Sequence, residues 1–406
     1  MDLLDITEKA LEKELCDHCL GRMFAQLGHG LTNDERGKAL RVYYSMAKTD
    51  EEKVEVPESS DDCSVCGNIF KDLEHFASLI VEAFQDYEFN TFLVGTRIDP
   101  EIEENEEMLW AELNVTTSEP IKSELNREIG KRVFDRIDAD VDLKTPEIKG
   151  ILDTRFDTVE VEIAPLFVFG RYRKFDRGIP QTKWTCKKCW GKGCDHCDGK
   201  GKMYETSVEE IIGEPLKEMA FGEDFTLHGM GREDIDARML GNGRPFVMEI
   251  KNPIVRDIDF EELKDKIKDD VRVEVGSLSF TNRDKIIEIK EARADKTYKV
   301  RVEHSSEVDR AKYKKALHSL KGTKISQRTP QRVSHRRSDK IRIRELKEIN
   351  LEKLEGKISE IVMRCEAGMY VKEFVHGDDG RTVPNLSEKI GVGCEVLVLD
   401  VLDVHY

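Results

Sequence analysis

The sequence predicts an α+β protein in which a zinc-bearing α/β module comes first and a domain rich in antiparallel sheet follows. Apolar residues recur at helical spacing in residues 5–47. Apolar and polar residues alternate as in strands in the second half, for example in residues 298–304 and 395–404. Eight of the ten cysteines form four C-x-x-C pairs, a spacing typical of zinc ligands. These three observations set the fold class.

The first module is predicted to begin with helices around the first C-x-x-C pair, and Asn33 starts a helix-initiation signal. A polar, acidic connector at residues 49–62 leads to the second pair, after which helical spacing resumes. Two such pairs can bind one Zn²⁺ tetrahedrally, although reduced buried cysteines fit the same pattern. The predicted ligands are Cys16, Cys19, Cys63 and Cys66.

The rest of the first module contains both helical spacing and strand-like alternation of apolar residues. Residues 92–95 and 109–115 are predicted to be strands, residues 123–137 a helix, and residues 158–169 a strand. Strands that alternate with helices favour an α/β arrangement.

The basic segment at residues 169–182 combines three Arg and one Lys with three aromatic residues. This mixture suits phosphate contacts combined with base stacking. A solvated basic linker whose aromatic side chains pack into the core fits the composition equally well. Its position between two modules favours RNA contact.

A compact cysteine knuckle follows, with four thiols in twelve residues and glycines at the turns. A redox dithiol is the alternative, but Lys192 and the glycines fit a zinc knuckle better than a thioredoxin-like βαβ unit. Four protein ligands leave no open position on the metal, so a structural role is expected. The predicted ligands are Cys186, Cys189, Cys194 and Cys197.

The remaining half, residues 207–406, is predicted to be an antiparallel-rich α+β domain. It contains no G-x-G-x-x-G, G-x4-G-K-[ST] or S-G-G-x-D-S motif, so no nucleotide or other organic cofactor is expected. The predicted elements are a helix at 261–269 and strands at 271–280, 285–289, 298–304 and 395–404.

The charge is unevenly distributed along this acidic chain, whose formal net charge is -17. Residues 101–120 carry seven Glu and no Lys or Arg, whereas residues 321–344 carry nine basic residues against one Asp. The basic run also has few apolar residues, which argues against a core element. A solvated face is the plain interpretation, but a local positive patch favours contact with structured RNA.

Nothing in the sequence suggests a membrane or an obligate protein partner. No apolar run approaches 18 residues, and the acidic start lacks the basic and apolar regions of a signal peptide. A cytoplasmic location is expected.

Residues 228–253 have the composition of a reaction site. Gly231 lets a ligand approach the backbone, while Arg232, Asp234 and Asp236 supply charge. An Arg nearby keeps a carboxylate ionised, so the carboxylate stays available as nucleophile or base. A salt-bridged turn is the alternative for an isolated G-R-x-D.

The whole segment closely resembles the catalytic motif of the archaeal-type tRNA pseudouridine synthases that modify T-arm positions 54 and 55. Gly231-Arg232-Glu233-Asp234 is similar to the G-R-x-D form of that motif. The resemblance implies that Asp234 is the nucleophile and that Arg232 orients it and contacts substrate. Asp236 is the competing candidate, although a role in bracing Arg232 or Arg238 is favoured. Attack at C1′, attack at C6 and deprotonation of C2′ all stay open.

Two tyrosines complete the resemblance. Members of the family place a Tyr against the target base, which implies that Tyr298 stacks on the uracil and helps remove the C5 proton. The segment around Tyr370 resembles the family's G-x-Y-[VI]-K-E-F, which implies a second substrate contact with Lys372 on the same side of a strand. A buried core aromatic residue is the alternative for each tyrosine.

The resemblance implies an N-terminal zinc-binding, THUMP-containing RNA-binding module at residues 1–170. A basic linker and zinc knuckle at 171–206 and a pseudouridine synthase catalytic domain at 207–406 would follow. The implied substrate is the tRNA T arm, with Zn²⁺ structural at two sites. A non-catalytic zinc-containing tRNA-binding protein is the alternative, and a THUMP-linked methyltransferase would need a cofactor loop that the sequence lacks.

Overall fold

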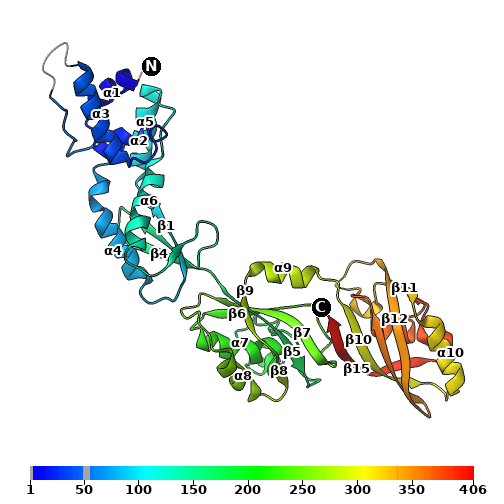
Figure 1. Cartoon of the computed structure of the whole chain (residues 1–406). Coiled ribbons are helices and arrows are strands. Elements are labelled where there is room, and N and C mark those ends of the chain that lie inside the picture. The colour runs from blue at the N-terminus through cyan, green and yellow to red at the C-terminus, as the bar shows by residue number, and fades with distance from the viewer. Residues whose placement is uncertain (1–2, 49–54, 336) are drawn as a thin grey trace. The chain divides into compact units, whose positions relative to one another are not determined.

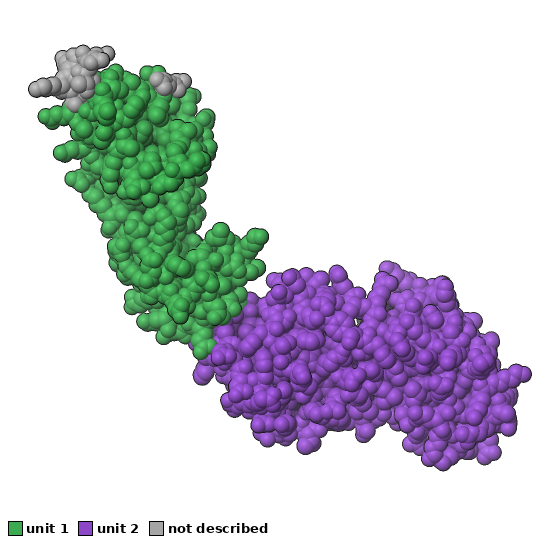
Figure 2. All heavy atoms as spheres, viewed as in Figure 1, with its two compact units in different colours: residues 1–164 green, residues 165–406 purple. Residues whose placement is uncertain are grey.

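The chain forms two compact units, residues 1–164 and 165–406 (Figure 2). The structure is a computed structural model that describes residues 3–48, 55–335 and 337–406. Residues 49–54 of the predicted connector and Arg336 of the basic run lie outside this range. Throughout the described ranges, no helix is both long and apolar enough to cross a membrane.

Unit 1 begins with helices, as predicted, and continues into a mixed α/β layer (Figure 1). A four-stranded sheet in the order β2-β1-β3-β4 pairs β1 in parallel with β2 and β3, and β3 antiparallel with β4. Helices α4 and α6 pack on each other and on this sheet. The elements are α1 (Leu3–Leu11), α2 (Asp17–Arg22), α3 (Asn33–Lys48), η1 (Ile69–Asp72), α4 (Leu73–Phe84), β1 (Thr91–Arg97), α5 (Pro100–Leu113), α6 (Ile121–Phe134), β2 (Asp140–Val141), β3 (Ile148–Asp153) and β4 (Thr158–Ile163).

The strand predicted at residues 109–115 is wrong, because residues 109–113 are the last turn of α5 and Asn114 caps its C-terminus. The Asp99 side chain accepts a hydrogen bond from the Glu101 N–H, and a proline follows at the first helical position. Leu109 and Leu113, four residues apart, are both buried. Seven residues are too few to distinguish this helical spacing from a strand in the sequence.

Unit 2 is built on an eleven-stranded sheet, which confirms the predicted antiparallel-rich sheet and also includes β5, from before the predicted start of that domain at residue 207. Its main path runs β14-β11-β12-β13-β10-β15-β7-β5-β8, with β6 on β7 and β9 on β5, and the contact of β15 with β7 is the parallel one. The strands are β5 (Leu166–Lys174), β6 (Asp224–Gly229), β7 (Arg238–Lys251), β8 (Val273–Val275), β9 (Ser279–Thr281), β10 (Asp295–His304), β11 (Thr323–Arg328), β12 (Ile341–Glu355), β13 (Ile358–Cys365), β14 (Thr382–Val383) and β15 (Cys394–His405).

Helices cover parts of this sheet: α7 and α9 pack on β6 and β7, and α10 packs on β12. The helix predicted at residues 261–269 is present as α8. The helical elements are η2 (Asp195–Cys197), α7 (Val208–Met219), α8 (Phe260–Lys268), α9 (Arg283–Glu291), α10 (Arg310–Leu320), η3 (Gln331–Val333), α11 (Val371–His376) and α12 (Leu386–Ile390).

Several strand predictions fail where a cap or a break was overlooked. Residues 285–289 belong to α9, which starts where the Asn282 side chain accepts from the Asp284 N–H. Residues 271–280 form two short strands instead of one. The pattern at 158–169 divides into β4 and β5 around Pro165, which has no N–H for a sheet hydrogen bond.

The basic run also differs from the prediction. Residues 323–328 form β11 within the large sheet, and Ile325 is fully buried. Part of the run is therefore a core element despite its charge. Lys372 lies in helix α11, with Tyr370 as the residue before its first turn, so the strand predicted for this pair is wrong.

Candidate active-site cleft and cysteine clusters

The predicted substrate site lies in a cleft of unit 2 with a volume of about 570 Å³. The loop at residues 230–237, between β6 and β7, forms one wall, and β10 and β15 contribute residues to it. Segments around η3 and the start of α11 also line the cleft. The cleft brings together all four residues predicted to act on substrate: Arg232, Asp234, Tyr298 and Tyr370.

A buried ion pair supports the loop that carries Asp234. The Arg244 Nε donates to Glu233 at 2.8 Å, and the two side chains are 1% and 0% exposed. The Tyr172 hydroxyl lies 2.9 Å from both Glu233 oxygens, and Gln181 donates to that hydroxyl at 2.8 Å. Burial, with the Glu233 charge, raises the pKa of Tyr172, so its phenol keeps the proton it donates. The loop holds the expected carboxylate and guanidinium pair, but Glu233 supplies the carboxylate and β7 the arginine.

A second support comes from Lys174 at the end of β5. Its fully buried ammonium donates to the carbonyl oxygens of Ile179 at 3.0 Å and Ile235 at 3.1 Å. Tyr172 and Lys174 belong to the segment predicted to contact RNA, yet both side chains face the interior. The basic composition concealed a buried strand that positions the loop.

Asp234 is paired with two cations that the sequence argument did not select. Lys372 Nζ lies 3.4 Å and Arg332 Nη1 lies 3.7 Å from Asp234 Oδ2. Arg332 also donates to Glu373 at 2.6 Å, which anchors the guanidinium. The prediction that Arg232 orients Asp234 is wrong, because the Arg232 guanidinium lies over the Trp184 ring, 5.4 Å from its centroid.

Asp236 is less suited to the cleft than Asp234. Its carboxylate lies 2.9 Å from Lys372 Nζ, so it does not brace Arg232 or Arg238 as predicted. Burial raises the pKa of Asp236, but the Lys372 hydrogen bond and charge outweigh this effect and the pKa falls below its usual range. Asp234 lines the cleft, whereas the Asp236 side chain is 67% exposed.

The cleft is cationic within a strongly acidic chain. Six basic side chains line it against two acidic ones, Glu233 and Asp234. Burial raises the pKa of Tyr298, so the phenol is neutral. Burial and the Arg244 charge lower the pKa of Lys296 to about 8. The basic residues are Arg232, Arg244, Lys296, Arg332, Arg337 and Lys372.

Tyr370 is fixed by the basic run. Its hydroxyl accepts from Arg337 at 3.0 Å. The Gln327 side chain donates to the Tyr370 carbonyl oxygen at 2.9 Å and accepts from its N–H at 2.8 Å. Arg332, Val333 and Arg337 of the basic run thus line the cleft, which a charge count along the sequence could not reveal.

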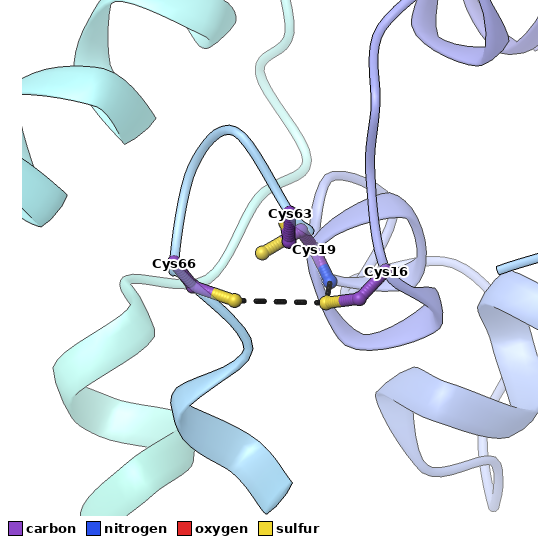
Figure 3. Close-up of side chains that lie close together, drawn as sticks. All are labelled: Cys16, Cys19, Cys63 and Cys66. Carbon is purple, nitrogen blue, oxygen red and sulfur yellow. Dashed lines mark hydrogen bonds between the residues drawn. The ribbon is translucent and has the colours of Figure 1, made fainter. Parts of the chain in front are cut away.

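The first predicted cysteine set comes together in unit 1 (Figure 3). Its four sulfurs lie within 4.8 Å of one another, and Cys16 Sγ is 3.6 Å from Cys66 Sγ. A tetrahedral metal with bonds of about 2.3 Å to sulfur places its ligands about 3.8 Å apart. The buried Arg22 donates to Cys19 Sγ at 3.4 Å, which helps to balance thiolate charge. This geometry fits a metal ion.

The second set forms a knuckle in unit 2. Its sulfurs also lie within 4.8 Å of one another, with separations of 3.7 to 3.9 Å among three pairs. Backbone N–H groups of Cys194 and Gly201 donate to Cys197 Sγ at 3.3 and 3.2 Å. Donors of this kind favour a thiolate, so these ligands too are suited to a metal.

Family models match both parts of the chain. A model described as "Pus10 THUMP domain, archaeal" matches residues 76–153, so the protein is of the THUMP-containing class. A model described as "Pus10, C-terminal" matches residues 167–405, which is more than half of the chain.

Curated relatives agree with these models over the full length. A Methanothrix thermoacetophila protein is 42% identical across 96% of this chain and 91% of its own. A Halorubrum lacusprofundi protein is 40% identical across 100% of this chain and 97% of its own. Both are called "tRNA pseudouridine synthase Pus10". The chain therefore belongs to the Pus10 family of tRNA pseudouridine synthases.

Among solved structures, a Cbf5-Nop10-Gar1 complex is similar at a TM-score of 0.30 and 16% identity, covering 48% of this chain and 45% of that one. This similarity is too low to add to the argument.

Proposed function

We infer that this protein isomerises uridine to pseudouridine in tRNA. The observation that carries the inference is the cationic cleft, in which an acidic side chain and a neutral tyrosine face the same space. The reaction exchanges the N1–C1′ bond for a C5–C1′ bond, while a proton leaves C5 and one is gained at N1. It needs no net redox change and no organic cofactor.

We propose Asp234 as the nucleophile that starts the reaction. It lines the cleft, and the cations Lys372 and Arg332 stabilise its carboxylate. Lys372 also pairs with Asp236, which holds that second carboxylate away from substrate. Asp236 is the alternative nucleophile. The variants Asp234→Ala and Asp236→Ala distinguish the two candidates.

Tyr298 is proposed to stack on the target uracil, with its neutral phenol near the reacting base. Tyr370, positioned by Arg337, is proposed as a second substrate contact in the same cleft. Arg232 remains a proposed substrate contact, because its side chain is exposed beside Trp184 at the cleft. Unstacking a uridine from a folded loop costs a few kcal/mol of free energy. Stacking of the base on an aromatic ring contributes about 1 to 3 kcal/mol, which offsets part of that cost.

The T arm is the proposed target, at positions 54, 55 or both. Residues 1–170 would bind the tRNA body, residues 171–206 would include the zinc knuckle, and residues 207–406 would carry the chemistry. Both cysteine sets are proposed to hold structural Zn²⁺, since all four ligands at each site come from the protein. The cytoplasm, where tRNA is modified, is the proposed location.

The test uses an unmodified tRNA transcript and three sequence variants that carry cytidine at position 54, at position 55 or at both. Pseudouridine is mapped after incubation by carbodiimide treatment and primer extension. Product at 54 or 55 in the wild-type transcript, lost when that position is cytidine, supports the proposal. Product elsewhere refutes the T-arm assignment, and binding without product from any transcript refutes the enzymatic function.

A further inference from the structure

The cysteine knuckle presents an exposed tryptophan that the metal-binding role does not require. Trp190 is 81% exposed, whereas Trp110 and Trp184 are partly buried. Its backbone N–H bonds the Cys186 carbonyl oxygen at 2.8 Å, so the residue is fixed at its position while the indole stays in solvent. Tryptophan is a highly buried residue type on average, and this exposure calls for a partner.

The backbone at Trp190 adds a second observation. The knuckle consists of two C-x-x-C-x-G-x-G repeats, Cys186–Gly193 and Cys194–Gly201. Trp190 and Asp198 occupy the same place in the two repeats, with φ of 53° and 49°. Asp tolerates this left-handed conformation, but a bulky aromatic residue there is strained, at a cost of order 1 to 3 kcal/mol. Local folding does not account for a tryptophan at this position.

The charge around the indole is positive. Residues 183–202 contain six Lys and two Asp. Within the described part of the chain, five of these ammonium groups have no hydrogen bond or ion pair: Lys183, Lys187, Lys188, Lys192 and Lys200. Exposed cations beside an aromatic ring are the combination that holds a phosphate next to a stacked base.

The knuckle is joined directly to the rim of the cleft. Thr185 pairs with Lys202, and the Met203 N–H donates to the Trp184 carbonyl oxygen at 2.9 Å. Trp184 itself lines the cleft, and Trp190 follows it six positions later in the chain. An extended chain of that length spans at most about 20 Å, so Trp190 lies within a few nucleotides of a uridine in the cleft.

We propose that the knuckle is an RNA-docking surface, on which Trp190 stacks with an unpaired nucleotide of the same tRNA and the neighbouring lysines hold its phosphates. This role rests on the proposed function and extends it, because the cysteine cluster then serves substrate binding as well as folding. Zinc knuckles and aromatic platforms use this chemistry to bind single-stranded RNA.

The central test is Trp190→Gly. Glycine removes the indole and is relaxed at positive φ, so the knuckle keeps or gains stability. We expect the affinity for tRNA, measured by filter binding, to fall about 5- to 150-fold, because one stacked base contributes about 1 to 3 kcal/mol.

Phe221→Ala is the matched control. Phe221 is also an exposed aromatic residue at positive φ in unit 2, at 67% exposure and φ of 48°, but it lies between Glu218 and Glu223. Its replacement leaves tRNA affinity unchanged. A second variant combines Lys188→Gln with Lys192→Gln. It lowers the slope of log Kd against log salt concentration by roughly 1.5, because two phosphate contacts are lost.

The outcomes separate the two proposals. Wild-type affinity in Trp190→Gly, or equal losses in Trp190→Gly and Phe221→Ala, overturns the docking surface. If Trp190→Gly lowers the melting temperature or the metal content, and the correctly folded, metal-loaded fraction binds tRNA with wild-type affinity, Trp190 has a structural role. This result also overturns the docking surface. Pseudouridine formation by the wild-type protein in the same samples shows that the enzymatic function stands in either case.

Discussion

The buried pair of Glu233 and Arg244 allows a quantitative test of how the reactive loop is held. Arg244→Met removes the 2.8 Å hydrogen bond to Glu233 and another 2.8 Å bond to the Met230 carbonyl oxygen. The remaining carboxylate is buried, with the Tyr172 hydroxyl as its donor. Breaking a buried pair in this way costs about 3 to 5 kcal/mol of unfolding free energy.

The double variant Glu233→Met with Arg244→Met is the matched control. It leaves no buried charge and costs about 1 to 3 kcal/mol, mainly because the Tyr172 hydroxyl loses its acceptor. The double variant is thus more stable than the single one. A displacement of the Asp234 loop by about 1 Å lowers the single-turnover rate of Arg244→Met about 100-fold.

Hydrogen exchange of peptides from β7, followed by mass spectrometry across a urea series, measures the local stability directly. Single-turnover pseudouridine formation in the absence of urea gives the rate. A loss below about 1 kcal/mol for Arg244→Met, or a double variant less stable than the single one, would refute the supporting role assigned to this pair.

Three further predictions follow from the same geometry. Lys372→Met slows single-turnover conversion about 10- to 100-fold by removing the cation beside Asp234, while Lys372→Arg keeps most of the rate; equal rates in the two variants contradict the role of this charge. Because the folded pKa of Lys296 is about 8 against an ordinary 10.5, its ammonium lowers stability below about pH 8, and this penalty disappears as the pH rises toward 10.5. Lys296→Met is therefore more stable than wild type at pH 7, by at most roughly 3 kcal/mol, and equal to it near pH 10.5, as thermal melts across pH check. Elemental analysis is expected to find two zinc ions per wild-type chain and one in Cys16→Ser or Cys186→Ser, and a full complement in either variant contradicts that site.

The sequence was sufficient where one residue type and its spacing determine the structure. The C-x-x-C pairs predicted both sulfur clusters, including the one whose halves lie far apart along the chain. Long alternating patterns predicted β10 and β15. The G-R-x-D loop and both tyrosines do line one cleft, because β10 and α11 bring them to the loop after β6.

The predictions failed where tertiary contacts decide the outcome. Lys174 was counted as a surface charge, yet carbonyl oxygens of the loop satisfy its ammonium in the interior. Asp234 pairs with Arg332 and Lys372, from segments about 100 and 140 residues away along the chain, and not with its neighbour Arg232. Proximity along the chain favoured the wrong arginine, because no local pattern encodes these pairs.

The most direct measurement is pseudouridine formation in an unmodified tRNA transcript by Asp234→Ala, with Asp236→Ala as the matched control. Filter binding in the same experiment checks that both variants retain tRNA affinity. The proposed mechanism predicts no product from Asp234→Ala at normal tRNA binding and clear product from Asp236→Ala. Product from Asp234→Ala, with loss in Asp236→Ala, would contradict it and assign the nucleophile to Asp236.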